Sequence, residues 1–167
     1  RCTEPGRLAE QWAAALSRWL DLNGLAGYDP FDVKQHPLMR ALQTHTWPRR
    51  VSTGMCDLFP KTVRRVLRVT PTENPKAFAL VALGSLRRFQ TTADTADLTR
   101  AAECLAWLRD HAVPGYGGLC WGYPFDVKGR GVDVPKGTPV GVVSAIAGEA
   151  FALAHMLTRE PPYAAAA

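Results

Sequence analysis

Two loops of this 167-residue chain share residue types that could do chemistry. The first reads GYDPFDVK over residues 27–34, and the second reads GYPFDVK over residues 122–128, so that Asp29 is an insertion in the first copy. Each loop combines two aromatic rings, a rigid proline, a carboxylate and an ammonium group. An aromatic ring offers an apolar face to the C–H surface of a sugar, and a carboxylate can bind hydroxyl groups or transfer protons. The repeated loop therefore favours a carbohydrate site.

The second loop carries the fuller set of candidate residues. We expect Trp121 and Tyr123 to form a platform for a sugar ring and Asp126 to act as acid or base. Lys128 or Arg130 would then pair with a carboxylate of the substrate, a task that suits the guanidinium geometry of arginine.

The first loop would supply the opposite wall of the site, through Tyr28 and Asp32. Two carboxylates on one rim could divide the acid and base work of a glycan reaction. The same residues also have a structural interpretation, in which each aspartate caps a neighbouring turn. Phe31 and Phe125 are expected to pack in the core, because phenylalanine is more often buried than exposed to a ligand.

Helical periodicity dominates the segments that must position these loops. Asn23-Gly24 suits a left-handed C-terminal cap, and Pro37, Pro60 and Asn74-Pro75 suit the first turns of helices. Helices are predicted at about 8–23, 37–44, 60–69, 75–89, 96–111 and 139–158. The single alternating pattern, at 131–134, is too short to build a sheet. The sequence therefore predicts an all-α fold, with one domain over residues 1–160 and a tail over 161–167.

Composition argues against several classes of protein and site. The most apolar stretch, Val140 to Leu157, is interrupted by Glu149 and His155, so no membrane span is predicted. The four cysteines lie far apart without a Cys-x-x-Cys pair, which predicts reduced thiols and a cytoplasmic location rather than zinc binding or a disulfide scaffold. The histidine spacing suggests no metal site, and no phosphate-binding glycine loop occurs, so neither metal nor cofactor is predicted.

The net charge of +5 raises the question of an anionic partner. Arginines and lysines concentrate at Arg49-Arg50, 61–68 and Arg87-Arg88. Within 61–68, apolar residues alternate with the arginines at helical spacing, which is typical of an amphipathic helix with a solvated basic face. A nucleic-acid partner is therefore not predicted, and the identity of an anionic partner stays open.

Three segments of the chain resemble bacterial α/α-toroid proteins found among polysaccharide-biosynthesis genes. They are residues 27–34, Asn74-Pro75-Lys76-Ala77 with the helix after it, and CWGYPFD at 120–126 followed by Gly137-Thr138-Pro139. The resemblance spans about residues 8–158, and its most specific pieces are WGYPFD and Thr-Pro. Such proteins are similar in architecture to six-hairpin glycosidases and sugar epimerases. The CWGY piece also resembles lanthionine cyclase-like toroids, but their zinc-binding Cys-His pair is absent here.

The resemblance implies a partial α/α toroid with its long loops on one rim. A complete six-hairpin ring needs about twice as many helices as are predicted here, so the chain would be roughly half of a ring. An open half ring leaves apolar helix faces uncovered, which implies a C-terminal half or a protein partner that covers them.

The hypothesis from these observations is a carbohydrate-active protein that handles an anionic bacterial polysaccharide or its precursor. Its ligand would be a glycan or a sugar-nucleotide-type molecule. An enzyme of this kind would be a glycoside hydrolase, a lyase or an epimerase-like protein. The alternative is a non-catalytic helical scaffold that binds a partner protein or a glycan. An isoprenoid- or peptide-cyclising toroid enzyme would need an aspartate-rich motif or zinc ligands, and neither is present in the sequence.

Overall fold

The computed structural model describes residues 4–29, 32–33, 36–42, 45–129 and 132–167. Helices dominate these residues, as the sequence predicts, and one short hairpin accompanies them. In chain order the elements are α1 (Glu4–Asn23), α2 (Pro37–Leu42), α3 (Thr46–Leu58), α4 (Pro60–Leu67), α5 (Pro75–Thr92), α6 (Thr95–Asp110), β1 (Val127–Gly129), β2 (Val132–Val134), α7 (Gly141–Thr158) and α8 (Pro161–Ala166).

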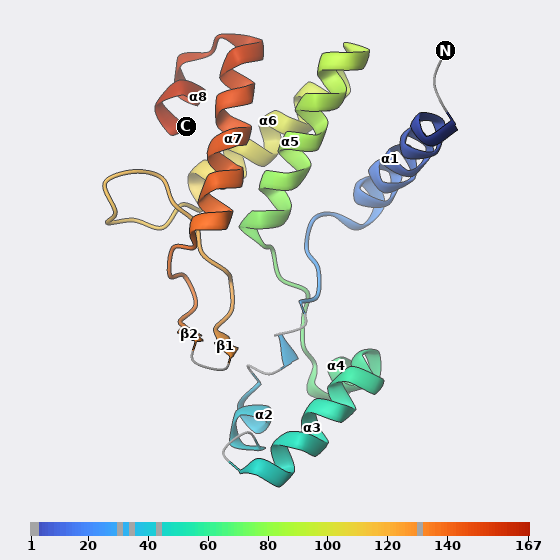
Figure 1. Ribbon diagram of the computed structural model, residues 1–167, viewed down its shortest axis with the longest axis vertical. Helices are drawn as coiled ribbons and strands as arrows, with labels where there is room; N and C mark the ends of the chain where they lie inside the picture. The colour runs from blue at the N-terminus through green and yellow to red at the C-terminus, as the bar shows by residue number, and fades with distance from the viewer. Residues whose placement is uncertain (1–3, 30–31, 34–35, 43–44, 130–131) are drawn as a thin grey trace.

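The main hydrophobic core lies in a bundle formed by α5, α6, α7 and α8 (Figure 1). The chain makes this packing possible by placing alanines where helices approach closely, with Ala79, Ala82, Ala147 and Ala150 fully buried. Larger side chains such as Leu86, Leu105, Leu108 and Phe151 fill the space between the helices. Close-packed cores of this kind are what make a helical scaffold rigid enough to hold loops in fixed positions.

Helix α7 is long and apolar enough to cross a membrane by length and composition alone. The core helix of a globular protein meets the same criterion, and α7 has five residues buried in the bundle, among them Phe151. The remaining α7 surface includes Glu149, which pairs with Arg87 of α5 at 2.7 Å. These contacts are those of a helix packed in the bundle.

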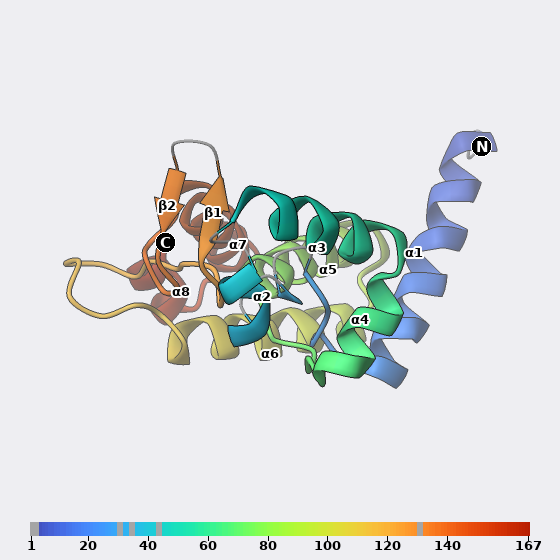
Figure 2. The same ribbon diagram turned by 90° about the horizontal axis from the view of Figure 1, so that it is seen from below.

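A smaller group of helices, α2, α3 and α4, lies at the opposite end of the molecule (Figures 1 and 2). We call residues 37–68 the basic lobe. Its small core contains Met39, Cys56 and Val63, with Leu67 packed against them, and Val33 of the first loop completes this cluster. The β1–β2 hairpin extends from the main bundle toward this lobe, with Val127 paired to Val134 in antiparallel register.

The helix boundaries follow from capping residues that the sequence makes visible. Asn74 caps α5 by accepting a hydrogen bond from the Lys76 amide at 3.0 Å, and Pro75 occupies the first turn. Asp94 caps α6 in the same way. Gly24, at φ +72°, ends α1 in the left-handed conformation that was expected there.

Two helices lie outside the predicted set. Pro48 and Gly54 argue against a helix over Thr46–Leu58, yet α3 forms because Pro48 falls in the first turn, where its missing N–H has no intrahelical partner. Residues 161–166, interpreted from sequence as a tail, form α8. The ring of Tyr163 packs against that of Phe151, with 6.3 Å between centroids.

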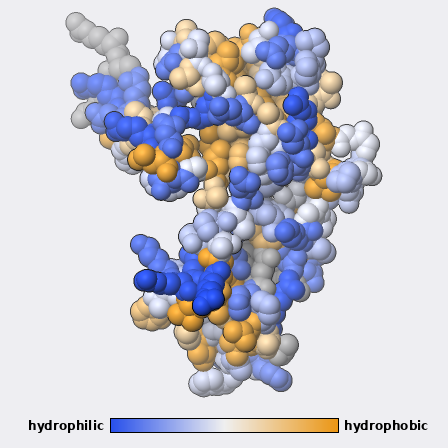
Figure 3. Space-filling view, turned by 180° about the vertical axis from the view of Figure 1, so that it is seen from behind, coloured by the Kyte–Doolittle hydropathy of each residue, from blue (hydrophilic) through white to orange (hydrophobic). Residues whose placement is uncertain are grey.

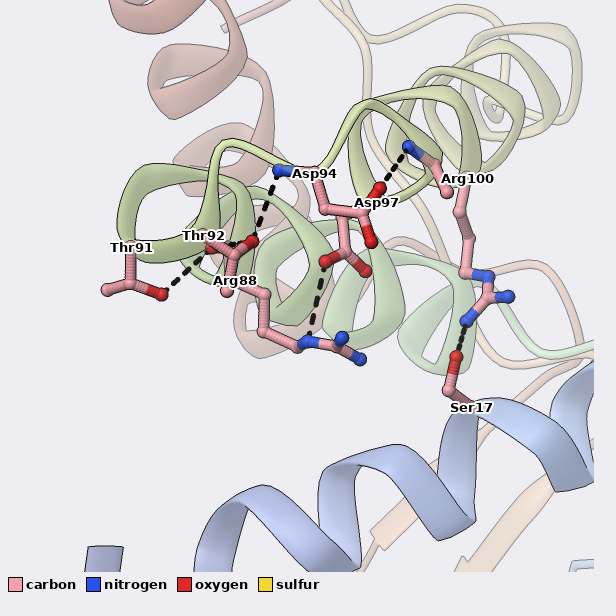
Figure 4. A network of polar contacts seen from close by, with 8 residues as sticks. Ser17, Arg88, Thr91, Thr92, Asp94, Asp97 and Arg100 are labelled. Atoms are coloured by element: carbon pink, nitrogen blue, oxygen red, sulfur yellow. Dashed lines mark hydrogen bonds and ion pairs between the residues drawn. The ribbon is translucent and has the colours of Figure 1, made fainter. Parts of the chain in front are cut away.

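Helix α1 lies beside the bundle and is attached to it by polar contacts (Figure 4). Arg100 of α6 donates hydrogen bonds to Ser17 and Asp21 of α1. Nearby, Arg88 of α5 contacts the buried carboxylate of Asp97 at 3.4 Å. A groove of about 310 Å³ remains between α1 and α5.

The outer side of α1 is apolar and exposed. Leu8, Trp12, Trp19 and Leu22 are all at least half exposed, and with Ala15 they follow a four-three-four-three spacing. That spacing is the one by which a helix packs along a second helix. The described residues of this chain leave the stripe uncovered.

Candidate functional site

The two copies of the repeated loop occupy corresponding positions in the fold. Each begins with a glycine that forms an isolated antiparallel bridge to the segment just before a bundle helix. Gly27 exchanges backbone hydrogen bonds with Thr72, shortly before α5, and Gly122 is bridged to Pro139, shortly before α7. The two copies differ in the segment that connects the loop to the residue bridged by its glycine. This segment contains α2, α3 and α4 in the first copy and the β1–β2 hairpin in the second.

In the first copy, Asp32 is held by Arg64 of α4. The Arg64 Nε lies 3.0 Å from Oδ2 and 3.3 Å from Oδ1 of Asp32, and the carboxylate side chain is only 6% exposed. The same arginine donates a hydrogen bond to the Asp29 carbonyl oxygen at 3.1 Å. Its guanidinium carbon Cζ lies over the ring of Tyr28, 4.9 Å from the ring centroid. Arg64 therefore contacts Tyr28, Asp29 and Asp32, and so holds both residues predicted to form one wall of the site.

In the second copy, Asp126 is held by Arg40 of α2. The two side chains form an ion pair, and Asp126 Oδ1 also accepts a hydrogen bond from the Lys136 amide at 2.9 Å. The ring of Tyr123 stacks on that of Phe125, with 5.2 Å between centroids and 12° between planes. Phe125 is buried at 5% exposure, as expected for a packing residue, whereas Phe31 lies outside the described residues.

Both aspartates are thus engaged by arginines that the basic lobe supplies. The carboxylate oxygens that proton transfer would use are occupied by guanidinium or backbone N–H groups. These pairs join the basic lobe to the two repeated loops. The direct effect of Asp32 and Asp126 in this conformation is therefore to position the loops.

Trp121 belongs to the core and not to an open surface. Trp121 is 1% exposed, and its ring stacks with that of Phe151, with 6.0 Å between centroids. Its Nε1 donates a hydrogen bond to the Leu108 carbonyl oxygen at 2.7 Å. A sugar platform needs an accessible ring face, and Trp121 offers none in this structure. Its contacts instead fix the start of the second loop, because its backbone N–H also donates to Ser144.

The two predicted cations of the second loop can be placed only in part. Lys128 lies in β1, where its backbone pairs with Asp133, and its side chain is not described. Arg130 lies outside the described residues. The structure therefore does not place the cationic groups of these two residues near any ligand position.

Two adjoining cavities lie between the repeated loops and the start of α5. The first, of about 280 Å³, is lined by Asp32 and His36 from the first loop region and by Pro124 and Phe125 from the second. The second, of about 410 Å³, is lined by Tyr123 and by polar residues that include Glu73, His111 and Lys136. Thr72 and Pro124 line both, so we call the combined space the rim cavity.

A stacked ladder of aromatic rings adjoins the rim cavity, and two of its members, Trp107 and His111, line the larger part. Phe78, Trp107 and His111 lie nearly parallel, with centroids 3.8 Å apart for the first pair and 4.0 Å for the second. The Trp107 Nε1 donates to Glu73 Oε2 at 3.2 Å, which places the carboxylate at the edge of the ladder. The Trp107 ring lies between Phe78 and His111, and the exposed His111 ring is therefore the outer member of the ladder.

The ring of His111 has a defined tautomer. Its Nδ1 lies 2.8 Å from the Trp107 carbonyl oxygen, which can only accept a hydrogen bond. Nδ1 must therefore carry the proton, and the neutral ring keeps an unprotonated Nε2. A neutral histidine in this state can accept a hydrogen bond from a hydroxyl group.

Sequence reasoning missed Glu73, Trp107 and His111 as candidate site residues. Trp107 and His111 are four residues apart on a helix, so their contact could have been anticipated from spacing. Glu73 directly precedes the Asn74-Pro75 helix start, but its pairing with Trp107 depends on how α5 packs against α6.

Among the described residues, no group of three His, Cys, Asp or Glu side chains could hold a metal ion.

No protein-family model, no curated protein and no solved structure matches this chain.

Proposed function

We propose that the chain binds carbohydrate in the rim cavity. The observation that carries the proposal is the lining of the 410 Å³ cavity, where Tyr123 and His111 stand beside Glu73 and Lys136. Aromatic rings suit the C–H faces of sugars, while a carboxylate and an imidazole nitrogen accept hydrogen bonds from their hydroxyl groups. The cavity volume is also within the range of sites for small ligands.

The cations at the rim favour an anionic glycan or a sugar-nucleotide-type ligand. Lys136 lines the larger cavity and Arg68 lines the smaller one, and both residues are exposed. Ammonium and guanidinium groups form strong charge-assisted hydrogen bonds with carboxylate or phosphate oxygens. Lys128, the last residue of the second loop, and Arg130, which follows it in sequence, extend the same proposal to the hairpin.

The arrangement also supports the proposed relation to a partial α/α toroid. One repeated loop lies between α1 and α5 in the chain, and the other lies between α6 and α7. The exposed stripe on α1 is the surface on which a further hairpin of a ring, or a partner protein, would pack. Under this proposal the rim cavity lies on the loop side of the ring.

A catalytic role for Asp126 or Asp32 would require ligand binding to release the carboxylate from its arginine. Asp126 is the better placed of the two, because its side chain is 21% exposed and its partner Arg40 is 53% exposed. The engagement of both carboxylates in ion pairs specifically favours the second candidate function, a scaffold that binds a glycan without changing it.

A glycan-array screen of the purified chain tests the proposal. We expect binding to acidic oligosaccharides, weakened about tenfold by Lys136→Gln because a charge-assisted hydrogen bond is lost. The matched control is Lys61→Gln, at another exposed lysine, in the basic lobe, which should bind as the parent chain does. Absence of binding to every glycan would refute the proposal, and equal losses in both variants would refute the assignment to the rim cavity.

A further inference from the structure

The positive charge of the chain is concentrated in the basic lobe. Residues 37–68 contain seven arginines and lysines and one aspartate, a formal net charge of +6, whereas the whole chain carries +5. The rest of the chain therefore carries a net charge of −1. Arg50, Lys61 and Arg65 are exposed, while Arg40 and Arg64 hold the two repeated loops.

The same lobe exposes large apolar side chains on α3. Trp47, Val51, Met55 and Leu58 recur at helical spacing along one side of α3 and are 76%, 47%, 53% and 75% exposed. Residues that α3 buries instead include Ser52 and Cys56, at 4% and 9% exposure. Helix α3 thus turns its more apolar side to the solvent, which is unusual for a helix of a small lobe.

The position of the lobe leaves this surface accessible. The lobe lies at one end of the longest axis of the molecule, with the main bundle at the other end (Figure 1). Seen from that end, α2, α3 and α4 lie in front of the bundle (Figure 2). The space-filling view shows hydrophobic and strongly hydrophilic side chains side by side on this part of the molecule (Figure 3).

We propose that the basic lobe docks on the surface of a membrane containing anionic lipids, with α3 lying in the interface. A helix with exposed Trp, Leu and Met beside arginines and lysines has the composition of interfacial helices, which insert apolar side chains between headgroups. The basic residues complement the negative surface potential of anionic lipids. This docking is peripheral, and it is independent of the glycan proposal.

Charge and apolarity together distinguish a lipid surface from other polyanions. A nucleic acid would be contacted through phosphate and stacked bases, and exposed Val51, Met55 and Leu58 would gain nothing from such contacts. An acyl-chain boundary accommodates these aliphatic and thioether groups and the tryptophan ring at once. A lipid surface is therefore the occupant that uses every exposed residue of the stripe.

Co-flotation with vesicles tests the proposal. We expect the full chain to float with vesicles of three parts phosphatidylcholine to one part phosphatidylserine, and not with phosphatidylcholine alone. A triple variant removes three exposed charges of the lobe through Arg50→Gln, Lys61→Gln and Arg65→Gln. Because each charge contributes about fivefold to the affinity, this variant should bind anionic vesicles about a hundredfold more weakly than the parent chain. Failure of the parent chain to float with anionic vesicles would overturn the proposal.

A pair of tryptophan variants locates the docking surface. Trp47→Ala removes the most exposed ring of the α3 stripe and should weaken vesicle binding several-fold. Trp12→Ala is the matched control, because Trp12 is 70% exposed on α1 but lies outside the basic lobe. Equal losses in the two variants would show that the basic lobe is not the docking surface and would overturn the proposal.

Hydrogen exchange of the unsubstituted chain gives a test that does not depend on the variants folding. Anionic vesicles should slow amide exchange in residues 46–58 and leave exchange in residues 75–110 unchanged. Protection of the bundle helices without protection of α3 would contradict the proposed orientation.

Discussion

At the residue scale, the ring of His111 is the group of the rim cavity whose neutral tautomer follows from a hydrogen bond to the backbone. The hydrogen bond to the Trp107 carbonyl places a proton on Nδ1, so Nε2 of the neutral ring is a hydrogen-bond acceptor. We expect the ¹⁵N shifts of the neutral His111 ring to show a protonated Nδ1 and an unprotonated Nε2. The other tautomer would remove the hydrogen-bond acceptor that we assign to the cavity wall.

The buried thiol of Cys104 should make the stability of the folded chain depend on pH. Burial, with a smaller contribution from Glu103, raises the pKa of its thiol from 9.0 to about 11, while Arg100 opposes the shift. The unfolded chain therefore loses this proton first as pH rises, and folding loses stability between about pH 9 and 11. Below pH 9 both states are protonated and the effect vanishes.

Urea unfolding of the parent chain and of Cys104→Ala measures this effect. The parent should lose more stability than Cys104→Ala between pH 9 and 10.5, because only the parent has the Cys104 thiol, whose pKa is raised by burial. Cys120→Ala, at the partly buried cysteine before Trp121, should behave as the parent does. Parallel pH dependences in the parent and Cys104→Ala would contradict the assignment.

Trp121 shows why a residue's type and neighbours do not determine its role. A tryptophan beside a glycine in an aromatic loop suggests a ligand platform. Its actual place is set by the packing of α6 against α7, which encloses the ring and brings the Leu108 carbonyl to Nε1. That packing involves residues distant in sequence, so the loop motif alone could not reveal it.

At the element scale, the two repeated loops are fixed by equivalent ion pairs in different environments. Asp32 and Arg64 are 6% and 18% exposed, whereas Asp126 and Arg40 are 21% and 53% exposed. Removing one partner of a buried pair leaves an uncompensated charge, while exposed pairs contribute about 0–1 kcal/mol. The coupling free energy of the Asp32–Arg64 pair should therefore be larger than that of the Asp126–Arg40 pair.

Double-mutant cycles in urea unfolding measure this difference. With alanine at each position, we expect a coupling free energy of about 1–3 kcal/mol for Asp32 and Arg64. The cycle for Asp126 and Arg40 should give about 1 kcal/mol or less. A larger coupling for the second pair would contradict the structural comparison.

The glycines that open the two loops differ in how much space surrounds them. A Cβ at Gly122 would lie 2.2 Å from the Thr138 carbonyl oxygen, whereas a Cβ at Gly27 would meet nothing within 4 Å. We expect Gly122→Ala to lower the free energy of unfolding by about 1–3 kcal/mol through steric overlap. Gly27→Ala is the matched control and should change stability little. Equal effects would mean that the bridge to Pro139 is not closely packed.

The sequence anticipates elements whose signals are local and misses features that depend on packing between elements. The caps at Asn23-Gly24 and Asn74-Pro75 lie next to the helices they bound, so the end of α1 and the start of α5 were predicted correctly, whereas α1 begins four residues earlier and α5 ends three residues later than predicted. Helix α3 was missed because Pro48 and Gly54 weaken its local signal. The Phe78–Trp107–His111 ladder joins α5 to α6, and no local pattern announces such a contact.

At the scale of the whole molecule, the rim cavity lies where the repeated loops, the start of α5 and the edge of the basic lobe meet. Arg40 and Arg64 connect the lobe to the loops, so the lobe takes part in shaping the cavity that we propose as a glycan site. The apolar stripe on α1 lies on a different element and is the proposed contact for a further hairpin or partner. Binding, docking and assembly would then use separate surfaces of the chain.

The indole N–H of Trp107 is a direct reporter of the central claim, because it lies in the rim cavity and donates to Glu73. We would record ¹H–¹⁵N spectra while adding a hyaluronan hexasaccharide, with maltohexaose as the neutral comparison. The account predicts that the acidic glycan shifts the Trp107 signal while the exposed Trp12 and Trp47 signals stay in place, and that the neutral glycan acts more weakly. An unshifted Trp107 signal, or equal shifts of all three indoles, would contradict it.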